Sequence, residues 1–144
     1  MPCRQMNPDE LPHVQAMMSA LCPAETKYDF TDEKVFVWER ETGGLGGFIS
    51  LAIRPWAEGC VSVPVPYVEG WWVAPDLRQS GVGRALMDQA ECWCRDNGYD
   101  ELGSDAELHN EISQRAHIAF GFKPTLRLQF FRKDLRVIGS EVPL

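Results

Sequence analysis

Apolar residues in the first part of the chain recur at the three- and four-residue spacing of a helix that buries one side. A helix start precedes them, with a capping Asn7, Pro8 at the first position and two acidic residues in the first turn. Pro23 stops the pattern. The spacing therefore predicts an amphipathic helix up to that proline, and its inward positions are Leu11, Val14, Met17, Met18 and Leu21.

Extended segments are predicted on either side of a second expected helix. That helix begins at Thr31, carries Val35, Phe36 and Trp38, and ends at Gly43. Residues 2–6 are expected to form a first strand and residues 45–53 another. Residues 60–74 are expected to be extended, with Pro64 and Pro66 marking a sheet edge or a break between two strands.

The second half alternates helices and strands. We expect a helix over residues 82–97 with Leu86, Ala90 and Trp93 inward, a short strand over 102–104, and a helix over 110–120. The inward residues of this last helix are expected to be Ile112, Ala116, Ala119 and Phe120. Residues 122–135 alternate enough to predict a terminal hairpin or long strand. The order of elements predicts an α/β fold in which helices flank a mixed central sheet.

Length and composition fit one domain over residues 1–144. Hydrophobic residues make up 44% of the chain and charged residues 24%, which are globular values. The formal net charge of −7 argues against nucleic acid as a partner and is compatible with a cationic substrate. The first thirty residues lack an apolar stretch long enough for a signal peptide or membrane span.

The cysteines favour a reducing, cytoplasmic setting, because five is an odd count without a close-packed framework. Cys92 and Cys94 are expected to point in different directions on a helix, with no histidine near them in sequence. We therefore expect no metal site, and interpret these two as buried small apolar side chains.

A glycine-punctuated loop, Arg78-Gln79-Ser80-Gly81-Val82-Gly83-Arg84, separates an apolar strand from the helix over 82–97. Gly81 and Gly83 remove Cβ atoms where backbone N–H groups must approach a ligand. The helix start adds the positive end of its dipole, so the turn is a predicted anion site. The loop lacks the third glycine of a dinucleotide fingerprint and the Gly-Lys-Ser/Thr of a Walker loop. An ordinary surface turn with incidental glycines is the alternative.

This loop, with Val73 and Pro75 upstream, resembles the Arg/Gln-x-x-Gly-x-Gly/Ala pyrophosphate loop of the GNAT N-acetyltransferases. The order of elements resembles the GNAT fold over nearly the whole chain, and Ala116 to Phe122 resembles the family's helix that ends in Gly-Phe. A more specific set spans residues 67–133 and resembles the small, single-domain aminoglycoside 6'-N-acetyltransferases. Its members are Tyr67 to Val73, Ser104-Asp105 followed by Asn110, Ile112 to Gln114, and Phe130 to Lys133.

The resemblance implies acetyl-CoA as co-substrate and a cationic aminoglycoside as substrate, with neither nucleic acid nor membrane as a partner; it is also compatible with a homodimer. The implied coenzyme-binding residues are Trp71, Trp72 and Val73 on the strand, Arg78, Gln79, Ser80, Gly81, Val82, Gly83 and Arg84 in the loop, and Asn110. The implied acidic residues of the substrate site are Glu69 and Asp105, and Trp56 stands where related sequences have a tyrosine that contacts substrate.

The chemistry of acetyl transfer gives the two acids roles as candidate catalytic residues. The attacking amine must be uncharged, so a carboxylate has to bind the ammonium and accept a proton, directly or through water. Glu69 is expected to fill that role and to share one strand face with Tyr67, Trp71 and Val73. Asp105 would hold the same or a second ammonium, and a strand N–H near Val73 would meet the oxyanion.

Each of these residues also has a purely structural interpretation. Glu69 as a solvated strand carboxylate, Asp105 as a turn residue and Asn110 as a plain helix cap remain open at this point. Phe131 occupies the position of a tyrosine that is a candidate acid for the departing thiolate in related sequences. The sequence thus favours an aminoglycoside 6'-N-acetyltransferase conferring resistance, in which the amine attacks directly in a ternary complex. The alternatives are an acetyltransferase for another cationic amine, such as a polyamine or amino acid, and a non-catalytic acyl-CoA-binding module.

Overall fold

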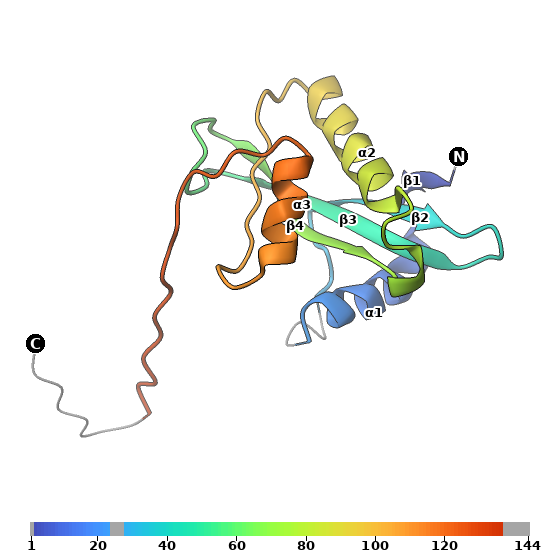
Figure 1. Cartoon of the computed structure of the whole chain (residues 1–144), viewed down its shortest axis with the longest axis horizontal. Helices are drawn as coiled ribbons and strands as arrows, with labels where there is room; N and C mark the ends of the chain where they lie inside the picture. Colours follow the sequence, from blue (N-terminus) through green and yellow to red (C-terminus); the bar gives the residue numbers. More distant parts are fainter. Residues whose placement is uncertain (1, 24–27, 137–144) are drawn as a thin grey trace, which may run out of the picture.

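A computed structural model describes residues 2–23 and 28–136 (Figure 1). Its sheet contains β1 (Cys3–Gln5), β2 (Lys34–Glu39), β3 (Leu45–Arg54) and β4 (Val65–Val73), which lie side by side in that order. All three strand pairs are antiparallel. One isolated parallel bridge joins Tyr67 of β4 to Gly103, which lies outside the four strands. Of the expected strand over 102–104, only Gly103 pairs.

Two helices cover opposite faces of this sheet (Figure 1). Helix α1 (Leu11–Leu21) follows the short 3-10 turn η1 (Pro8–Glu10), and α2 (Val82–Asp96) follows the 3-10 turn η2 (Pro75–Leu77). Both helices match the predicted ranges closely. The core between α1 and the sheet consists of Val14, Met17, Met18, Phe30, Val35, Val37 and Phe48. The core between α2 and the opposite face of the sheet consists of Phe36, Ile49, Leu51, Val68, Val82, Leu86, Met87, Ala90 and Cys94.

Residues 34–39 form strand β2, so the predicted second helix over residues 31–43 is wrong. Val35 and Val37 pack under α1, whereas Phe36 packs under α2. A strand buried on both faces carries a continuous apolar run, and such a run also contains apolar pairs at helical spacing. The β-branched residues in this run favour the strand.

Helix α3 (Glu111–Ala119) lies where the sequence predicts a helix, but of the four residues expected to face inward only Ala116 and Phe120 are partly buried. Ile112 is 81% exposed and Ala119 is exposed, while His117 and Phe120 are partly buried. The rings of His117 and of the C-cap residue Phe120 both contact Trp71. Because the contact is made by so few side chains, spacing alone does not identify its inward face.

The segment after α3 is not the predicted hairpin or strand. Residues 122–134 have no regular secondary structure. The segment passes Gly59, next to Thr125, and then runs away from the body of the molecule (Figure 1). We call residues 123–136 the C-terminal arm. Its exposed apolar residues are Leu126, Leu128, Phe130, Phe131 and Leu135. Since this segment pairs with no strand among the described residues, these side chains are exposed to water.

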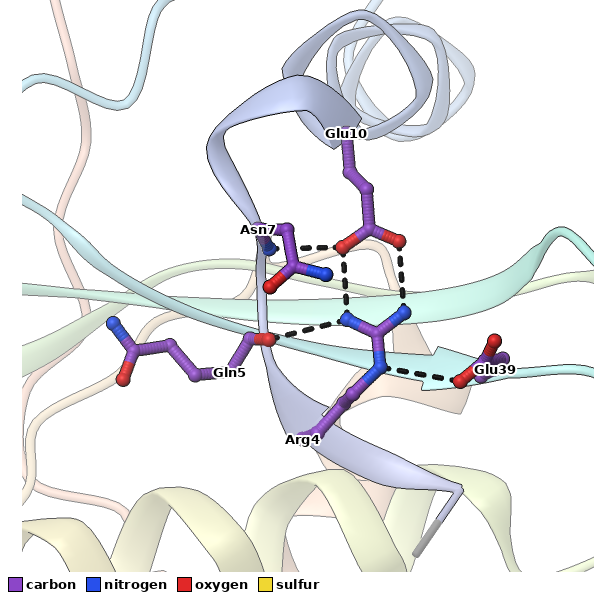
Figure 2. A network of polar contacts seen from close by, with 5 residues as sticks. All are labelled: Arg4, Gln5, Asn7, Glu10 and Glu39. Atoms are coloured by element: carbon purple, nitrogen blue, oxygen red, sulfur yellow. Dashed lines mark hydrogen bonds and ion pairs between the residues drawn. The ribbon is translucent and has the colours of Figure 1, made fainter.

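A polar network at the start of the chain fixes β1 against α1 (Figure 2). The guanidinium of Arg4 donates to both oxygens of Glu10 at 2.8 and 2.9 Å, and to Glu39 at 3.2 Å. Glu10 also accepts the N–H of Asn7 at 2.8 Å, which closes the helix start predicted from the sequence. The hydrogen bond from Arg4 lowers the pKa of Glu10 to about 2.

Candidate active site

A bulge in β4 lies at the centre of the candidate site. Ser50 pairs with Gly70 and the next residue of β3, Leu51, pairs with Val68, so Glu69 is an extra residue without a partner in β3. A bulge of this kind bends its strand and redirects the side chains around it. It therefore changes which residues of β4 share a face.

The residues of β4 on either side of the bulge confirm this change. Trp71 and Val73 pack with Val68 against the core under α2, while Trp72 packs under α1. Tyr67 belongs to a small separate cluster with Ala57 and Val65. The prediction that Glu69, Tyr67, Trp71 and Val73 share one face is therefore wrong, because simple alternation does not continue through an inserted residue.

Glu69 shares its side of the sheet with Arg54, at the end of β3. The Arg54 guanidinium donates to both carboxylate oxygens of Glu69, at 2.7 and 2.9 Å. It also stacks over the Tyr67 ring, 3.7 Å from the ring centre. The Glu69 side chain is only 19% exposed, so it is not the freely solvated strand carboxylate of the alternative interpretation. The hydrogen bonds that Arg54 donates to Glu69 raise the pKa of Arg54.

Asp105 joins the same group of side chains through Tyr67. The Tyr67 hydroxyl donates to Asp105 at 2.8 Å. Burial, and secondly this hydrogen bond, raise the pKa of Tyr67, so the phenol stays a neutral donor. Gly103 makes the approach possible, because a Cβ there would lie 2.6 Å from the Tyr67 ring. The structure thus brings Glu69, Arg54, Tyr67 and Asp105 into one group, which we call the carboxylate cluster.

Glu33 adds a further acidic group near this cluster. Its half-buried carboxylate accepts a short hydrogen bond from the Tyr28 hydroxyl. Burial raises the pKa of Glu33, and the charge of Glu69 raises it further. Sequence reasoning missed both Glu33 and Arg54. A wrongly assigned helix hid the first, and only the register of β3 against β4 shows that the second reaches Glu69.

The glycine loop has the backbone of an anion site. Gln79 and Gly81 have positive φ angles of 61° and 92°, and Gly81 is the N-cap of α2. No side chain of the described residues caps this helix, so its first N–H groups remain available to a ligand. The Ser80 hydroxyl, which makes a short hydrogen bond to the Leu77 carbonyl, stabilises the turn.

The two arginines of the loop lie apart. Arg78 donates through Nε to the Val73 carbonyl at 2.9 Å, at the end of β4. Arg84 lies over the Phe120 ring at 4.5 Å and makes a long 3.5 Å contact with the Ala119 carbonyl. Both arginines are exposed, so each keeps donors for a ligand at this end of the sheet.

The glycines of the loop serve two different purposes. Gly81 adopts a left-handed conformation, and a Cβ added there would meet nothing within 4 Å, so the backbone rather than packing requires glycine. At Gly83 a Cβ would lie 3.7 Å from Val73 and 3.8 Å from Trp71, which are ordinary contacts. Of these two glycines, only Gly83 therefore accepts a side chain without strain within the protein.

An open strand edge connects the loop with the carboxylate cluster. Strand β4 is at the end of the sheet, and beyond its bridge at Tyr67 its outer edge pairs with no other described strand. Trp71 lies beside this edge, against His117 and Phe120 of the α3 region. Its indole Nε1 is buried without a hydrogen-bond partner in the described residues.

The other residues singled out in the sequence form no hydrogen bond or ion pair with the carboxylate cluster in the described part of the chain. Asn110 caps α3, because its side-chain oxygen accepts a hydrogen bond from the Ser113 N–H at 3.1 Å. This is the structural role that the sequence left open for it. Trp56 is 62% exposed in the loop after β3. Phe131 is 90% exposed on the C-terminal arm. Cys94 is buried as predicted, but Cys92 is exposed.

The described part of the chain contains neither a metal-binding cluster nor a membrane-spanning helix. Within residues 2–23 and 28–136, no three His, Cys, Asp or Glu side chains are arranged to hold a metal ion. No helix in these ranges has both the length and the apolar character needed to cross a bilayer.

Comparison with known proteins identifies relatives of one kind. Residues 6–122 match the Acetyltransferase (GNAT) family. An aminoglycoside N(6')-acetyltransferase type 1 of Klebsiella aerogenes is 47% identical over 89 residues, or 62% of this chain and 59% of that protein. The chain therefore spans less than two thirds of that relative. A protein of the same name from Salmonella enteritidis is 33% identical over 143 residues, covering 92% of this chain and 99% of that protein.

Solved structures agree with these relatives. AAC(6')-Iy in complex with the bisubstrate analogue CoA-S-monomethyl-acetylneamine has a TM-score of 0.79 at 33% identity, and the match covers 92% of this chain and 97% of that one. AAC(6')-Iy in complex with CoA has a TM-score of 0.78 at 35% identity, with 92% and 98% covered. The resemblance and the fold predicted from the sequence are confirmed, whereas the roles of individual site residues remain predictions.

Removal of the Arg54 guanidinium should destabilise the protein, because Glu69 would then be a poorly exposed carboxylate without a partner. We expect Arg54→Met to lower the free energy of unfolding by about 1–3 kcal/mol. Arg54→Lys should lower it less, because lysine keeps the charge but loses the paired hydrogen bonds and the stacking. Urea denaturation measures both effects. Arg115→Met is the matched control, since Arg115 forms an exposed ion pair with Glu111. An Arg54→Met protein as stable as the control would contradict this account.

Proposed function

Because the chain belongs to the GNAT acetyltransferase family, we propose that it transfers the acetyl group of acetyl-CoA to the 6' amine of an aminoglycoside and so gives resistance. One observation carries the proposal. A helix start without a side-chain cap and a carboxylate cluster lie at the two ends of the same open strand edge. This arrangement suits a co-substrate with a pyrophosphate and a substrate with several ammonium groups.

The coenzyme lies along β4 in this proposal. The N–H groups of residues 79–84 bind the pyrophosphate at the start of α2, and Arg78 and Arg84 add positive charge. The pantetheine arm then pairs with the free edge of Trp71, Trp72 and Val73 as an added strand would. The thioester consequently reaches the bulge at Glu69. Asn110 contributes a side-chain amide near the reacting end in addition to capping α3.

The substrate approaches from the carboxylate cluster. Charge-assisted hydrogen bonds to Glu69 and Asp105 hold the ammonium groups, with Trp56 at the rim, and the net charge of −7 favours the encounter. Arg54 already forms an ion pair with Glu69, so a substrate ammonium either competes with the guanidinium or binds beside it. The uncharged 6' amine attacks the thioester directly in a ternary complex, and a backbone N–H of β4 meets the developing oxyanion.

A different cationic amine, such as a polyamine or an amino acid, is the alternative substrate that the acidic cluster would also accept. A non-catalytic acyl-CoA-binding module is disfavoured, because Glu69 and Asp105 converge at the end of the open edge.

The functional unit in this proposal is a homodimer located in the cytoplasm. The C-terminal arm supports the dimer, because its apolar side chains lie in water in the single chain and a second copy would cover them. The five cysteines, all unpaired thiols, support a reducing compartment.

Gly83→Val tests the coenzyme site. The added side chain makes ordinary contacts inside the protein but projects where the pyrophosphate approaches, so the fold should survive while acetyl-CoA affinity falls at least about tenfold, or about 1.4 kcal/mol. Calorimetric titration measures the affinity. Asp88→Val, at an exposed position later in α2, is the control. Equal affinities for the two variants would refute the loop assignment. Gly81→Val is a poorer test, since the positive φ of Gly81 adds strain.

The identity of the product tests the proposed reaction. With acetyl-CoA as donor, drugs that carry a 6' amine should be acetylated at that amine, and a 6'-hydroxyl analogue should bind without turnover. Mass spectrometry with fragmentation locates the acetyl group, and release of free thiol gives the rate. Acetylation of the hydroxyl analogue at a ring amine, or faster turnover of spermidine than of any 6'-amino drug, would favour the alternative substrate class.

Sedimentation equilibrium tests the proposed dimer. The full chain should sediment at about twice its monomer mass of 16.3 kDa. Phe130→Asp combined with Phe131→Asp should shift it to the monomer, because charged side chains in the arm oppose burial. Ile112→Asp, on the exposed side of α3, is the control for an added charge. A wild-type protein that is monomeric at micromolar concentration would exclude the dimer.

A further inference from the structure

Ser104 and His117 form a hydrogen-bonded pair that the proposed function does not yet use. The Ser104 hydroxyl lies 2.7 Å from Nε2 of His117, and Nδ1 of His117 lies 2.7 Å from the Ser113 carbonyl oxygen. A carbonyl oxygen only accepts, so Nδ1 carries the hydrogen. In the neutral ring Nε2 is therefore the acceptor and the Ser104 hydroxyl is its donor.

The groups packed around this ring are uncharged. The Trp71 ring from β4 lies 5.8 Å away edge-on, and the Phe122 ring after α3 lies 5.2 Å away. The Ser113 hydroxyl is 3.4 Å from Nδ1. Two charged side chains of this region contact other groups in the described residues, since Arg84 covers Phe120 and Asp105 accepts from Tyr67. The ring is held in one orientation without a competing charge.

Ser104 stands where the open edge of β4 begins. The Val68 N–H donates to the Gly103 carbonyl at 2.9 Å, and the Gly103 N–H donates to the Pro66 carbonyl at 2.9 Å. In the described part of the chain these are the last backbone hydrogen bonds between the two segments, and Ser104 is the next residue. In the proposed function the thioester lies at this end of the edge, beside Glu69. Ser104 is therefore close to the reacting atoms.

We propose that Ser104 and His117 relay the proton from the attacking nitrogen to the departing sulfur, an inference that rests on the proposed function. The uncharged amine forms a bond from nitrogen to the thioester carbon. The nitrogen then gives a proton to Ser104 Oγ as the Ser104 hydrogen passes to Nε2. The carbon–sulfur bond breaks with its electron pair on sulfur, and the imidazolium returns the proton through Ser104. An amide and a thiol result, and both side chains regain their starting state.

Two observations explain why the reaction needs this relay. Both oxygens of Glu69 already accept hydrogen bonds from Arg54, so a proton from the amine would have to displace one of these bonds. Phe131, at the position of the tyrosine acid in related sequences, has no ionisable group. A neutral imidazole that is hydrogen-bonded to a hydroxyl can both accept the proton from the nitrogen and return it to the sulfur. Ser104 meets the reacting atoms, and His117 acts through Ser104.

Variants at the two positions test the relay in the full-length protein. Ser104→Ala removes the relay and should lower kcat about 100-fold while the KM for acetyl-CoA stays unchanged. Ser104→Thr keeps a hydroxyl and should retain most of the activity. His117→Phe keeps an aromatic ring against Trp71 and Phe122 but cannot accept a proton. Its kcat should fall to the level of Ser104→Ala.

Two readouts separate a relay from a structural role. Because both residues act as one unit, the double variant should be no slower than either single variant, whereas independent effects would multiply. The pH profile of kcat is the second readout, and it should differ between the wild type and His117→Phe, because only the wild type has a ring that exchanges a proton with Ser104. Melting temperatures and acetyl-CoA affinities of all variants confirm that each is folded.

The outcomes also separate the relay from the proposed function. A wild type that acetylates no aminoglycoside contradicts the proposed function. A wild type that turns over, with Ser104→Ala within threefold of its kcat or with multiplicative losses in the double variant, overturns the relay alone. Nitrogen NMR of the histidines in the wild type gives a test without turnover. A neutral His117 with hydrogen on Nδ1 is expected, and hydrogen on Nε2 would overturn the relay.

Discussion

One inserted residue in a strand determines how the site of this protein is arranged. At Glu69 the pairing of β4 with β3 skips a residue, and the side chains beyond it change faces. Trp71 and Val73 thereby pack in the core under α2, while Glu69 stays with Arg54 and Tyr67. Gly70 allows the bend, because a Cβ there would meet the Phe48 ring at 2.9 Å and the Met18 sulfur at 3.1 Å. A straight strand would bury Glu69 or expose Trp71.

The bulge also separates two charge environments along one strand edge. On the side of α2 a helix start presents free N–H groups, with Arg78 and Arg84 nearby, and this end attracts anions. On the other side a bidentate ion pair and a tyrosine hold two carboxylates, which attract cations. A reaction between an anionic co-substrate and a cationic substrate needs an anion site and a cation site a short distance apart. The open edge of β4 supplies the connection, and the Ser104–His117 pair lies at the end where the two meet.

Local patterns predicted much of this architecture. The helix start at Asn7 and the glycine loop before Val82 are signals contained in a few neighbouring residues, and both were found from the sequence. The predictions failed where neighbouring strands decide the outcome. Val35 to Val37 are buried from both faces, which hides the alternation of a strand, and the inserted Glu69 breaks the alternation expected from Tyr67 to Val73. The sequence did not indicate Arg54, because only the register of β3 against β4 brings it to Glu69. It did not indicate a role for His117, because the hydrogen-bond partner of His117, Ser104, lies outside helix α3.

The central claim is that the coenzyme occupies the open edge of β4 between the glycine loop and Glu69. Hydrogen–deuterium exchange of the full-length protein, with and without CoA, tests it most directly. The account predicts that CoA slows amide exchange in residues 71–73 and 79–84 and leaves exchange in β1 and β2 unchanged. Unchanged exchange in both of those segments under saturating CoA, with protection elsewhere, would contradict it.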